Sequence, residues 1–510
     1  MIKLIHQHSK KVYAVYKDRE QLSGYSENLV KTFWKLAEDF PTEKIIWIEE
    51  AQQNNLNEKA FDDVFHHHLI MASCAIKSLY FSSDIGYVDQ FPFANINLEV
   101  QYPTWLMSSD MGGIYASVVL KFKNEFQNIS NFEYLLNAIA KLGQHHGLFC
   151  YHAPQLAIKI EKNLEYTATV VDLFSFAFQF YKKVRGIILL LCFIRYKKKY
   201  PLKSLIFSCL KTNFFSVEID FSDITIQSSK ASIDHSIDVV IPTIGRPKHL
   251  LNVLEDLKKQ NFLPQKVIIV EQNPDKGTTS DFDFIIEDWP FEIQHIFTHQ
   301  TGACNARNSA LQRVTASWVF FCDDDNKFEA NLLESAFSKI EKYGLEVLVT
   351  AYRTKQEVLL YKNPKQWGTF GAGNTIIKKA CLKEVAFDLS FEYGYGEDMD
   401  FGMQLRNQGI DIVYHPEIEI VHLKAPMGGF RTKIIKPWEQ KEPFPKPSPT
   451  VMRFIQKNYT RAQRRAYKII LWLKFYKVQD IKNPLKYRKS MQKRWETSKS
   501  WAQQISKKAI

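Results

Sequence analysis

The residues with the clearest capacity for chemistry are three consecutive aspartates, Asp323, Asp324 and Asp325, which follow the apolar run SWVFFC. Carboxylates a few ångströms apart repel one another and resist joint ionisation. A divalent cation removes that penalty, and carboxylate oxygens suit Mg²⁺ or Mn²⁺, which commonly also bind substrate phosphates. The alternative is a solvated acidic turn that leads into the next helix. The triplet alone indicates either a metal site or a polar loop.

A second acidic pair, Glu397 and Asp398, lies in the segment GYGEDMDFGMQLRNQG and is expected to begin a helix. In an aromatic, partly dry pocket, burial raises the pKa of a carboxyl group, which can then accept a proton from a hydroxyl as a general base. Helix N-termini also stabilise negative charge without any catalytic role. Taken alone, the pair is compatible with either interpretation.

Two further features could complete a site. His422 follows a predicted strand in IEIVH. It is a candidate metal ligand because neutral imidazole binds such ions, although a single histidine at a strand end commonly has a structural role. The segment Gly371-Ala372-Gly373-Asn374 is a glycine stretch where the backbone can approach a ligand closely. A G-x-G pattern alone is weak evidence for ligand binding. Its order among the other motifs must show whether it belongs to a site.

The elements that must position these residues alternate between strand and helix from residue 237 onward. The apolar segments at 237–243, 266–272 and 317–325, the last of which ends in the three aspartates, are typical of buried parallel strands. The helical segments between them predict a doubly wound α/β/α sandwich, in which ligands bind beyond the carboxyl ends of the strands. Such ends carry Pro242, Thr243, Glu271 and the aspartate triplet. We therefore expect these residues to face one crevice.

The order of these segments resembles the family 2 glycosyltransferases, which have the GT-A fold. In chain order the segments are VVIPTIGRP, VIIVEQN, GACNARN (302–308), FFCDDDN, FGAGN and GYGEDMDFGMQLRNQG. They match the family's Pro-Thr strand end, acidic second strand, G-x-x-x-A-R-N segment, DxD motif, acceptor loop and ED motif. All six occur in order over about 190 residues. IIVEQN, GYGEDMD and VHLK also look like segments of the animal β-1,4-galactosyltransferases.

The resemblance implies a role for each residue. The nucleotide-sugar donor would be bound by Pro242, Thr243, Arg246, Glu271, Arg307, Asp323 and Asp324. A divalent metal, Mn²⁺ or Mg²⁺, would be held by Asp325, Asp323 and His422. Asp398 would be the catalytic base and Glu397 would hold the acceptor sugar, which Gly371, Gly373 and Asn374 would also contact. Two departures from the family pattern are Gln272, where a second acid is common, and the extra aspartate inside the DxD motif. The choice of Asp325 over Asp324 as metal ligand therefore stays open.

These roles predict a metal-dependent, inverting glycosyltransferase. It would move a sugar from a nucleotide-diphosphate sugar to a hydroxyl of a glycan or lipid-linked glycan, in surface-polysaccharide or glycolipid assembly. The displacement would pass through an oxocarbenium-like transition state. The alternative is a catalytically inactive scaffold that binds a nucleotide sugar or a partner at the membrane surface, although the intact Glu397-Asp398 pair argues against it. A nucleotidyltransferase is disfavoured because IPTIGRP has only one glycine.

The rest of the chain carries no motif of comparable order. Residues 1–160 predict an N-terminal α/β domain of unknown role, either a degenerate GT-A-like domain or a module that binds the acceptor or a partner. Residues 161–235 read as a helical, basic and aromatic connector with a linker. The catalytic domain is expected over 236–442, and a Pro-rich linker with a basic amphipathic helical tail over 443–510.

Composition and charge narrow the expected location. Seven cysteines without CxxC spacing favour a reducing compartment. The longest apolar run, 187–194, is much shorter than the roughly 20 residues of a membrane-spanning helix. We expect a cytoplasmic protein.

The net charge of +12 resides in the tail, because residues 451–510 contain 17 Lys or Arg against Asp480 and Glu496. Together with the aromatic residues of the tail, this pattern suits an amphipathic helix on an anionic membrane, at the inner face of the plasma membrane. The alternative is a helical face packed on the catalytic domain. Nucleic acid is not an expected partner, because no recognised binding module is present.

Overall fold

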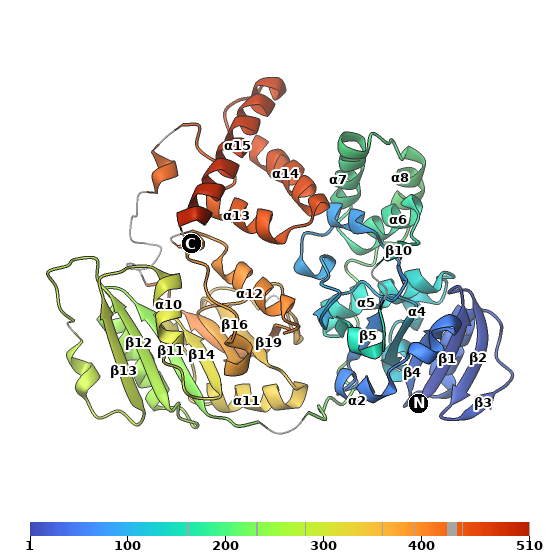
Figure 1. The fold of residues 1–510 in the computed structure, drawn as a ribbon, viewed down its shortest axis with the longest axis horizontal. Helices are drawn as coiled ribbons and strands as arrows, with labels where there is room; N and C mark the ends of the chain where they lie inside the picture. Colours follow the sequence, from blue (N-terminus) through green and yellow to red (C-terminus); the bar gives the residue numbers. More distant parts are fainter. Residues whose placement is uncertain are drawn as a thin grey trace. The chain divides into compact units, whose positions relative to one another are not determined.

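The computed structural model describes residues 1–160, 163–230, 233–280, 282–359, 361–392, 394–425, 436–440 and 442–508. The chain divides into two compact units (Figure 1). The first unit comprises Met1–Lys230 and Tyr459–Leu473, and the second comprises Ala231–Asn458 and Lys474–Ile510. The C-terminal region therefore contributes to both units.

The second unit is built on a nine-stranded mixed sheet (Figure 1). Its path runs through β13 (Glu292–Thr298), β12 (Lys266–Gln272), β11 (Ile237–Thr243), β14 (Trp318–Cys322), β18 (Asn374–Lys378), β16 (Val347–Arg353), β19 (Val413–His422) and β15 (Asn326–Lys327), and β17 (Lys365–Gln366) also pairs with β19. Strands β13, β12, β11 and β14 are mutually parallel, whereas β18 is antiparallel to both of its neighbours. The predicted α/β fold class is confirmed, and the antiparallel β18 makes the sheet mixed.

Helices cover this sheet where the sequence predicts them. They are α9 (Pro247–Lys258), α10 (Ala303–Leu311), α11 (Leu332–Tyr343) and α12 (Glu397–Asn407). Pro247 fits the first turn of α9, where its missing N–H costs nothing. Gly344 ends α11 in the left-handed region, with φ 63°. The apolar stripe of α9 is fully buried in the same core as alternate residues of β11, so packing fixes how the helix lies against the sheet.

The first unit contains an eight-stranded sheet and its own helices, as expected for an additional α/β domain. The strand order is β3 (Glu20–Leu22), β2 (Lys11–Lys17), β1 (Ile2–Gln7), β4 (Lys44–Glu49), β8 (Met111–Tyr115), β5 (Ile70–Cys74), β9 (Phe149–His152) and β7 (Tyr102–Pro103). Helices α1 (Leu29–Asp39), α5 (Phe132–His146) and α6 (Val170–Phe180) contribute buried residues to its core. No helix in the described part of the chain is long and apolar enough to span a bilayer.

The two sheets share a five-strand succession. In the second unit the neighbours are β11, β14, β18, β16 and β19, and in the first unit they are β1, β4, β8, β5 and β9. In both, successive pairs are parallel, antiparallel, antiparallel and parallel. The fourth strand along the chain inserts between the second and third in each case. A helix then joins the fourth strand to the fifth, α12 in the second unit and α5 in the first.

The C-terminal region is helical, as predicted, with α13 (Pro449–Asn458), α14 (Arg461–Tyr476) and α15 (Pro484–Lys508). In the second unit, α13 packs against α12 and α15. In the first unit, Gln463 of α14 is buried and its amide donates to the carbonyl oxygens of Asp89 and Phe91, each at 3.2 Å. Trp495 of α15 is also buried. Much of the apolar side of this region therefore contributes to packing.

Candidate functional site

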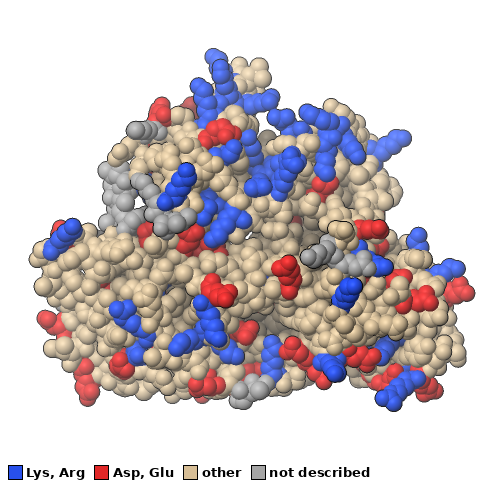
Figure 2. Space-filling view, viewed as in Figure 1, with Lys and Arg blue, Asp and Glu red and all other residues tan. Residues whose placement is uncertain are grey.

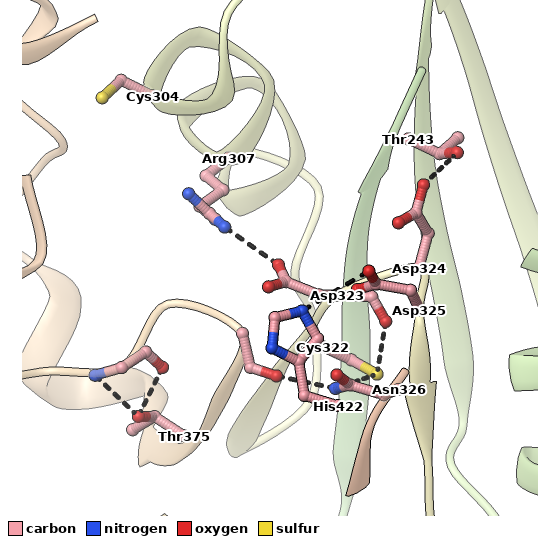
Figure 3. A network of polar contacts seen from close by, with 12 residues as sticks. Thr243, Cys304, Arg307, Cys322, Asp323, Asp324, Asp325, Asn326, Thr375 and His422 are labelled. Carbon is pink, nitrogen blue, oxygen red and sulfur yellow. Dashed lines mark hydrogen bonds and ion pairs between the residues drawn. The ribbon is translucent and has the colours of Figure 1, made fainter. Parts of the chain in front are cut away.

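The aspartate triplet follows β14, and its middle residue points inward (Figure 3). Asp324 accepts hydrogen bonds from the Thr243 hydroxyl at 2.7 Å and from the Arg246 guanidinium at 2.6 Å. Burial raises the pKa of Asp324 to about 6, even though both of these donors favour its ionised form. The side chain therefore ties the end of β14 to the end of β11, which brings together three of the predicted donor-binding residues.

Asp325 faces the predicted metal ligand His422. Its carboxylate lies 3.4 Å from Nε2 of His422 and accepts the backbone N–H of Ala425 at 2.8 Å. Burial opposes ionisation, but His422, the Ala425 N–H and Arg246 outweigh it and lower the pKa of Asp325 to about 2. The His422 ring stacks on Tyr352, with centroids 4.7 Å apart. This packing fixes the direction of the imidazole.

Asp323 is the exposed member of the triplet. Its side chain is 29% exposed, against 4% for Asp324 and 3% for Asp325. One carboxylate oxygen accepts from Arg307 at 3.0 Å, and the other lies against Gly373. A Cβ at that glycine would come within 2.2 Å of the oxygen. The glycine of the predicted acceptor loop is therefore required for the backbone to approach Asp323.

Arg307 on α10 is buried between carboxylates from two motifs. Burial lowers the pKa of its guanidinium, but the charges of Asp323 and Asp398 outweigh that effect and raise it overall. The guanidinium also lies over the Phe387 ring, 5.6 Å from its centroid. The Arg307 cation therefore links the aspartate triplet to the acidic pair at the start of α12. These two motifs are far apart in the sequence.

Glu397 and Asp398 occupy the first two positions of α12, after Gly396 with φ 123°. The backbone N–H of Ala372 donates to the Asp398 carboxylate, which places the glycine loop beside this acid. The Oδ1 atom of Asp398 is inaccessible to solvent and has no hydrogen-bond partner within the described residues. Burial raises the pKa of both carboxyl groups. A carboxylate in this state can accept a proton near neutral pH.

Helix α12 is fixed by a residue that sequence reasoning missed. Asp400 is buried, and its carboxylate accepts from Lys457 at 2.7 Å and from Asn458 at 2.9 Å. Both donors belong to α13. The GYG loop (residues 394–396) also packs against α13. A Cβ at Gly394 would lie 2.4 Å from the side chain of Thr450. The C-terminal region therefore positions the helix that carries Asp398.

Helix α10 is anchored by a second residue missed from the sequence. The Glu392 carboxylate accepts the backbone N–H groups of Cys304 at 3.1 Å and Asn305 at 3.0 Å, at the helix N-terminus. A Cβ at Gly302 would come within 2.3 Å of Glu392. This contact explains the glycine that opens the G-x-x-x-A-R-N segment. No local pattern marks Glu392, because 88 residues separate it from Cys304.

Other predicted residues have partners of their own. Glu271, at the end of β12, accepts from Ser280 at 2.5 Å and lies 2.8 Å from Nε2 of His295. It is the register partner of Thr243 on β11, so it lies on the same sheet edge.

The Asn374 amide donates to the Thr350 carbonyl at 2.9 Å and thereby links β18 to β16. Pro242 is half-buried on β11. Neither His295 nor Ser280 lies in a motif that marks it in the sequence.

The metal site stays a prediction, and two of its three expected ligands are neighbouring side chains. Asp325 and His422 offer a carboxylate oxygen and an imidazole nitrogen, which are ligands that Mn²⁺ accepts. Within the described residues, no group of three or more His, Cys, Asp or Glu side chains is arranged to hold an ion. Mg²⁺-type sites commonly use one or two protein ligands and complete their shell with water and substrate phosphates. The pair fits such a site.

Comparison with known proteins identifies the domain. Residues 238–396 match the model of glycosyl transferase family 2. The matched segment is less than half of the chain, so the similarity is that of one domain. The match includes the first five segments of the predicted motif series and ends at Gly396, so Glu397, Asp398 and His422 lie beyond it.

Curated relatives match over short segments. Glycosyltransferase GlyA of Streptococcus pneumoniae is 24% identical over 128 residues, which are 24% of this chain and 18% of that protein. The poly(ribitol-phosphate) beta-N-acetylglucosaminyltransferase TarS of Staphylococcus aureus is 24% identical over 113 residues, 22% of this chain and 20% of TarS. A crystal structure of S. aureus TarS 1-349 with UDP-GlcNAc aligns at 18% identity and TM-score 0.36, covering 54% of this chain and 82% of that one. The chain thus spans only about a fifth of these two curated relatives.

Replacing Gly373 by alanine tests the close approach at Asp323. The added Cβ must displace the Asp323 carboxylate from Arg307, because the two atoms cannot remain 2.2 Å apart. A displacement of about 1 Å at a reacting site can cost roughly a hundredfold in rate. We expect Gly373→Ala to lower turnover of a nucleotide-sugar donor at least tenfold, measured as released nucleotide. Gly277→Ala is the control, since nothing lies within 4 Å of its Cβ. Equal losses in the two variants would contradict the role of this contact.

Proposed function

We propose that the second unit transfers a sugar, with inversion, from a nucleotide-diphosphate sugar to an acceptor hydroxyl. The observation that carries this proposal is the solvent-inaccessible Asp398 oxygen without a partner, next to the buried Arg307 and the aspartate triplet. An unpaired buried oxygen is costly in a protein unless a ligand uses it. An acceptor hydroxyl that donates its proton to Asp398 would supply the missing hydrogen bond.

Asp398 is proposed as the general base. Its raised pKa suits removal of a proton from the hydroxyl as that oxygen attacks the anomeric carbon. Glu397, one position earlier, is proposed to hold the acceptor sugar. Displacement by the hydroxyl on the face opposite the leaving diphosphate inverts the anomeric configuration in one step. Gly371 and Gly373 belong to the loop whose Ala372 N–H donates to Asp398, and this loop is proposed to contact the acceptor sugar.

Donor binding is proposed along the strand ends. Thr243, Arg246 and Glu271 lie where a nucleoside would extend across β11 and β12, and Arg307 with Asp323 lies next to the proposed base. Asp325 and His422, with Asp323 on the exposed side, would hold Mn²⁺ or Mg²⁺. The ion, when bound, would neutralise charge on the departing diphosphate. Asp324 is proposed to set the spacing of this group through Thr243 and Arg246.

The acceptor is proposed to be a glycan or lipid-linked glycan of a surface-polysaccharide or glycolipid pathway. Support comes from TarS, whose name specifies sugar transfer onto poly(ribitol-phosphate). TarS and GlyA match this chain over 113 and 128 residues, and not over their full lengths. The exact donor sugar is therefore best found by direct screening.

The first unit is proposed to be a second copy of the same fold that performs no transfer. Glu133 is the second residue of α5, as Asp398 is of α12, so the two acids hold equivalent positions. Glu133 accepts hydrogen bonds from the Thr167 hydroxyl at 2.8 Å and from Ser109. At the end of β4, where Asp323 follows in the other unit, Glu49 pairs with His6 at 2.9 Å. These acids are used internally, which supports a closed site.

A donor screen tests the activity. Release of nucleotide from a panel of UDP-, GDP- and dTDP-sugars should be seen for at least one donor. We expect Mn²⁺ or Mg²⁺ to raise the rate and EDTA to abolish the increase, because the proposed ion compensates the leaving diphosphate. Absence of release with every donor, with and without metal, would favour the inactive scaffold.

The base assignment is tested by matched substitutions in the two units. Asp398→Asn should lower transfer to an acceptor by about 10²–10⁴-fold, the usual contribution of a general base. Nucleotide binding and melting temperature should stay near wild type. Glu133→Gln changes the equivalent acid of the first unit and should leave the rate within about twofold. Near wild-type transfer by Asp398→Asn, or a comparable loss in Glu133→Gln, would refute the assignment.

The pH dependence follows from the raised pKa of the acidic pair. A base must be ionised to accept a proton, so transfer should decline as the pH falls through the pKa of Asp398. Burial raises this pKa, and the acid limb should therefore lie well above the ordinary aspartate value near 4. The log of kcat/KM against pH, with nucleotide binding followed in parallel, gives the position of the limb. A rate that is flat down to pH 4.5 would contradict the prediction.

A further inference from the structure

Helix α8 (Leu202–Cys209) of the first unit has its apolar face on the outside. Ser204 and Ser208 are its buried residues, and the Ser208 hydroxyl lies 3.2 Å from that of Ser175. Ile206 and Phe207 are 62% and 55% exposed, and Leu210 just beyond the helix is 83% exposed. A helix on the surface of a water-soluble domain normally shows the reverse pattern. The sequence of α8 is therefore adapted to an apolar environment outside the protein.

Helix α7 (Val184–Cys192) also has an exposed apolar side. Ile188, Leu189 and Cys192 face the core, whereas Val184, Ile187 and Leu191 are exposed. The exposed residues are spaced three and four apart, so they form one stripe along the helix. The segment between the two helices adds the exposed residues Tyr200 and Leu202, and Phe215 follows α8. Two neighbouring elements of the chain thus present apolar stripes to solvent.

The charge around these stripes has a single sign. Residues 181–215 contain nine Lys or Arg and no Asp or Glu. They are Lys182, Lys183, Arg185, Arg195, Lys197, Lys198, Lys199, Lys203 and Lys211. Figure 2 shows Lys and Arg gathered over the part of the molecule where α7 and α8 lie. Lys197 is paired with Asp84 at 2.9 Å, and several others lie over aromatic rings, but the side chains of 198, 199 and 203 are exposed.

The exposed apolar residues and the positive charge around them together favour one kind of binding partner. The centres of protein interfaces are depleted in lysine, which makes a protein partner a poor fit. A second copy joined by two-fold symmetry would bring the same cationic surface against itself. An anionic bilayer offers both complements, because acyl chains receive the apolar stripes and phosphate groups receive the lysines.

We propose that α7, the following turn η6 (Phe193–Lys197) and α8 form a surface that lies on an anionic lipid bilayer. The helices lie in the plane of the interface and do not cross it. The proposal differs from a contact through the C-terminal helices, whose Gln463 and Trp495 are buried in the protein. It deepens the proposed function by bringing the first unit to the membrane where a lipid-linked acceptor would reside. The exposed residues and charges that support the proposal lie outside the proposed transferase site.

Vesicle flotation of the full-length protein tests this surface. Wild type should float with vesicles of 70% phosphatidylcholine and 30% phosphatidylglycerol, bind neutral phosphatidylcholine vesicles at least tenfold more weakly, and be released by 0.5 M NaCl. Ile206→Glu with Phe207→Glu should lower binding at least tenfold. Cys209 is the exposed member of the seven thiols, so a polarity-sensitive dye attached there should shift to the blue on binding.

Three controls make the test specific. Ile286→Glu places the same charge on a side chain that is 90% exposed in the second unit and should bind vesicles as wild type does. Leu485→Glu, on the exposed side of α15, should also keep binding. Nucleotide release by the α8 variant in detergent-free buffer should stay near wild type, which separates loss of the surface from loss of the active site.

The proposal would be overturned by any of three results. Wild type could fail to bind anionic vesicles, the α8 variant could bind them as well as wild type does, or Leu485→Glu could abolish binding. Light scattering adds a further check on the occupant. If wild type is a dimer that the α8 variant converts to a monomer, the surface serves a second copy of the chain instead.

Discussion

The arrangement of the catalytic unit depends on one buried cation. Arg307 compensates Asp323 from one motif and Asp398 from another, and burial raises the pKa of Asp398, which makes that carboxylate difficult to keep ionised. A guanidinium suits this position because it stays charged when buried and offers a planar set of donors. Replacing Arg307 by a neutral residue would leave these acids facing one another without a compensating charge. The loss of stability would be far greater than for a surface ion pair. The position of Arg307 depends in turn on Glu392, which anchors the N-terminus of α10.

The proposed difference between the two units would not come from the fold, because function depends on the site that a fold carries. Their five central strands have the same order and directions, and each places an acid at the second position of the same helix. The difference lies in how the acid is satisfied. Glu133 receives hydrogen bonds from Thr167 and Ser109, whereas one oxygen of Asp398 has no partner in the described part of the chain. When neighbouring hydroxyls occupy a carboxylate with hydrogen bonds, the carboxylate is no longer free to bind a substrate. This would be a simple way for a duplicated site to lose its function.

The sequence was informative where function requires short, local patterns. Buried strands are continuous apolar runs, so their ends could be located, and the acids at those ends could be named before their surroundings were known. The antiparallel direction of β18 could not be predicted, because an apolar run does not encode which way a strand points. The contacts of Glu392 with α10 and of Asp400 with α13 join residues 88 and 58 positions apart, and neither pairing leaves a local signal. The exposed apolar face of α8 was hidden for a similar reason, since periodicity does not state which side of a helix is buried.

The C-terminal region shows what a count of charges leaves out. Its basic residues suggested a separable membrane tail, yet Lys457 and Asn458 bind the buried carboxylate of Asp400, two positions after the proposed base. Deleting this region would leave that carboxylate without its donors and expose the GYG loop that Thr450 covers. A truncated chain would therefore lose order at α12 whether or not the deleted helices touch lipid. Membrane contact and catalysis can be separated only by substitutions on an exposed surface, and α8 provides one whose side chains play no part in the transferase site.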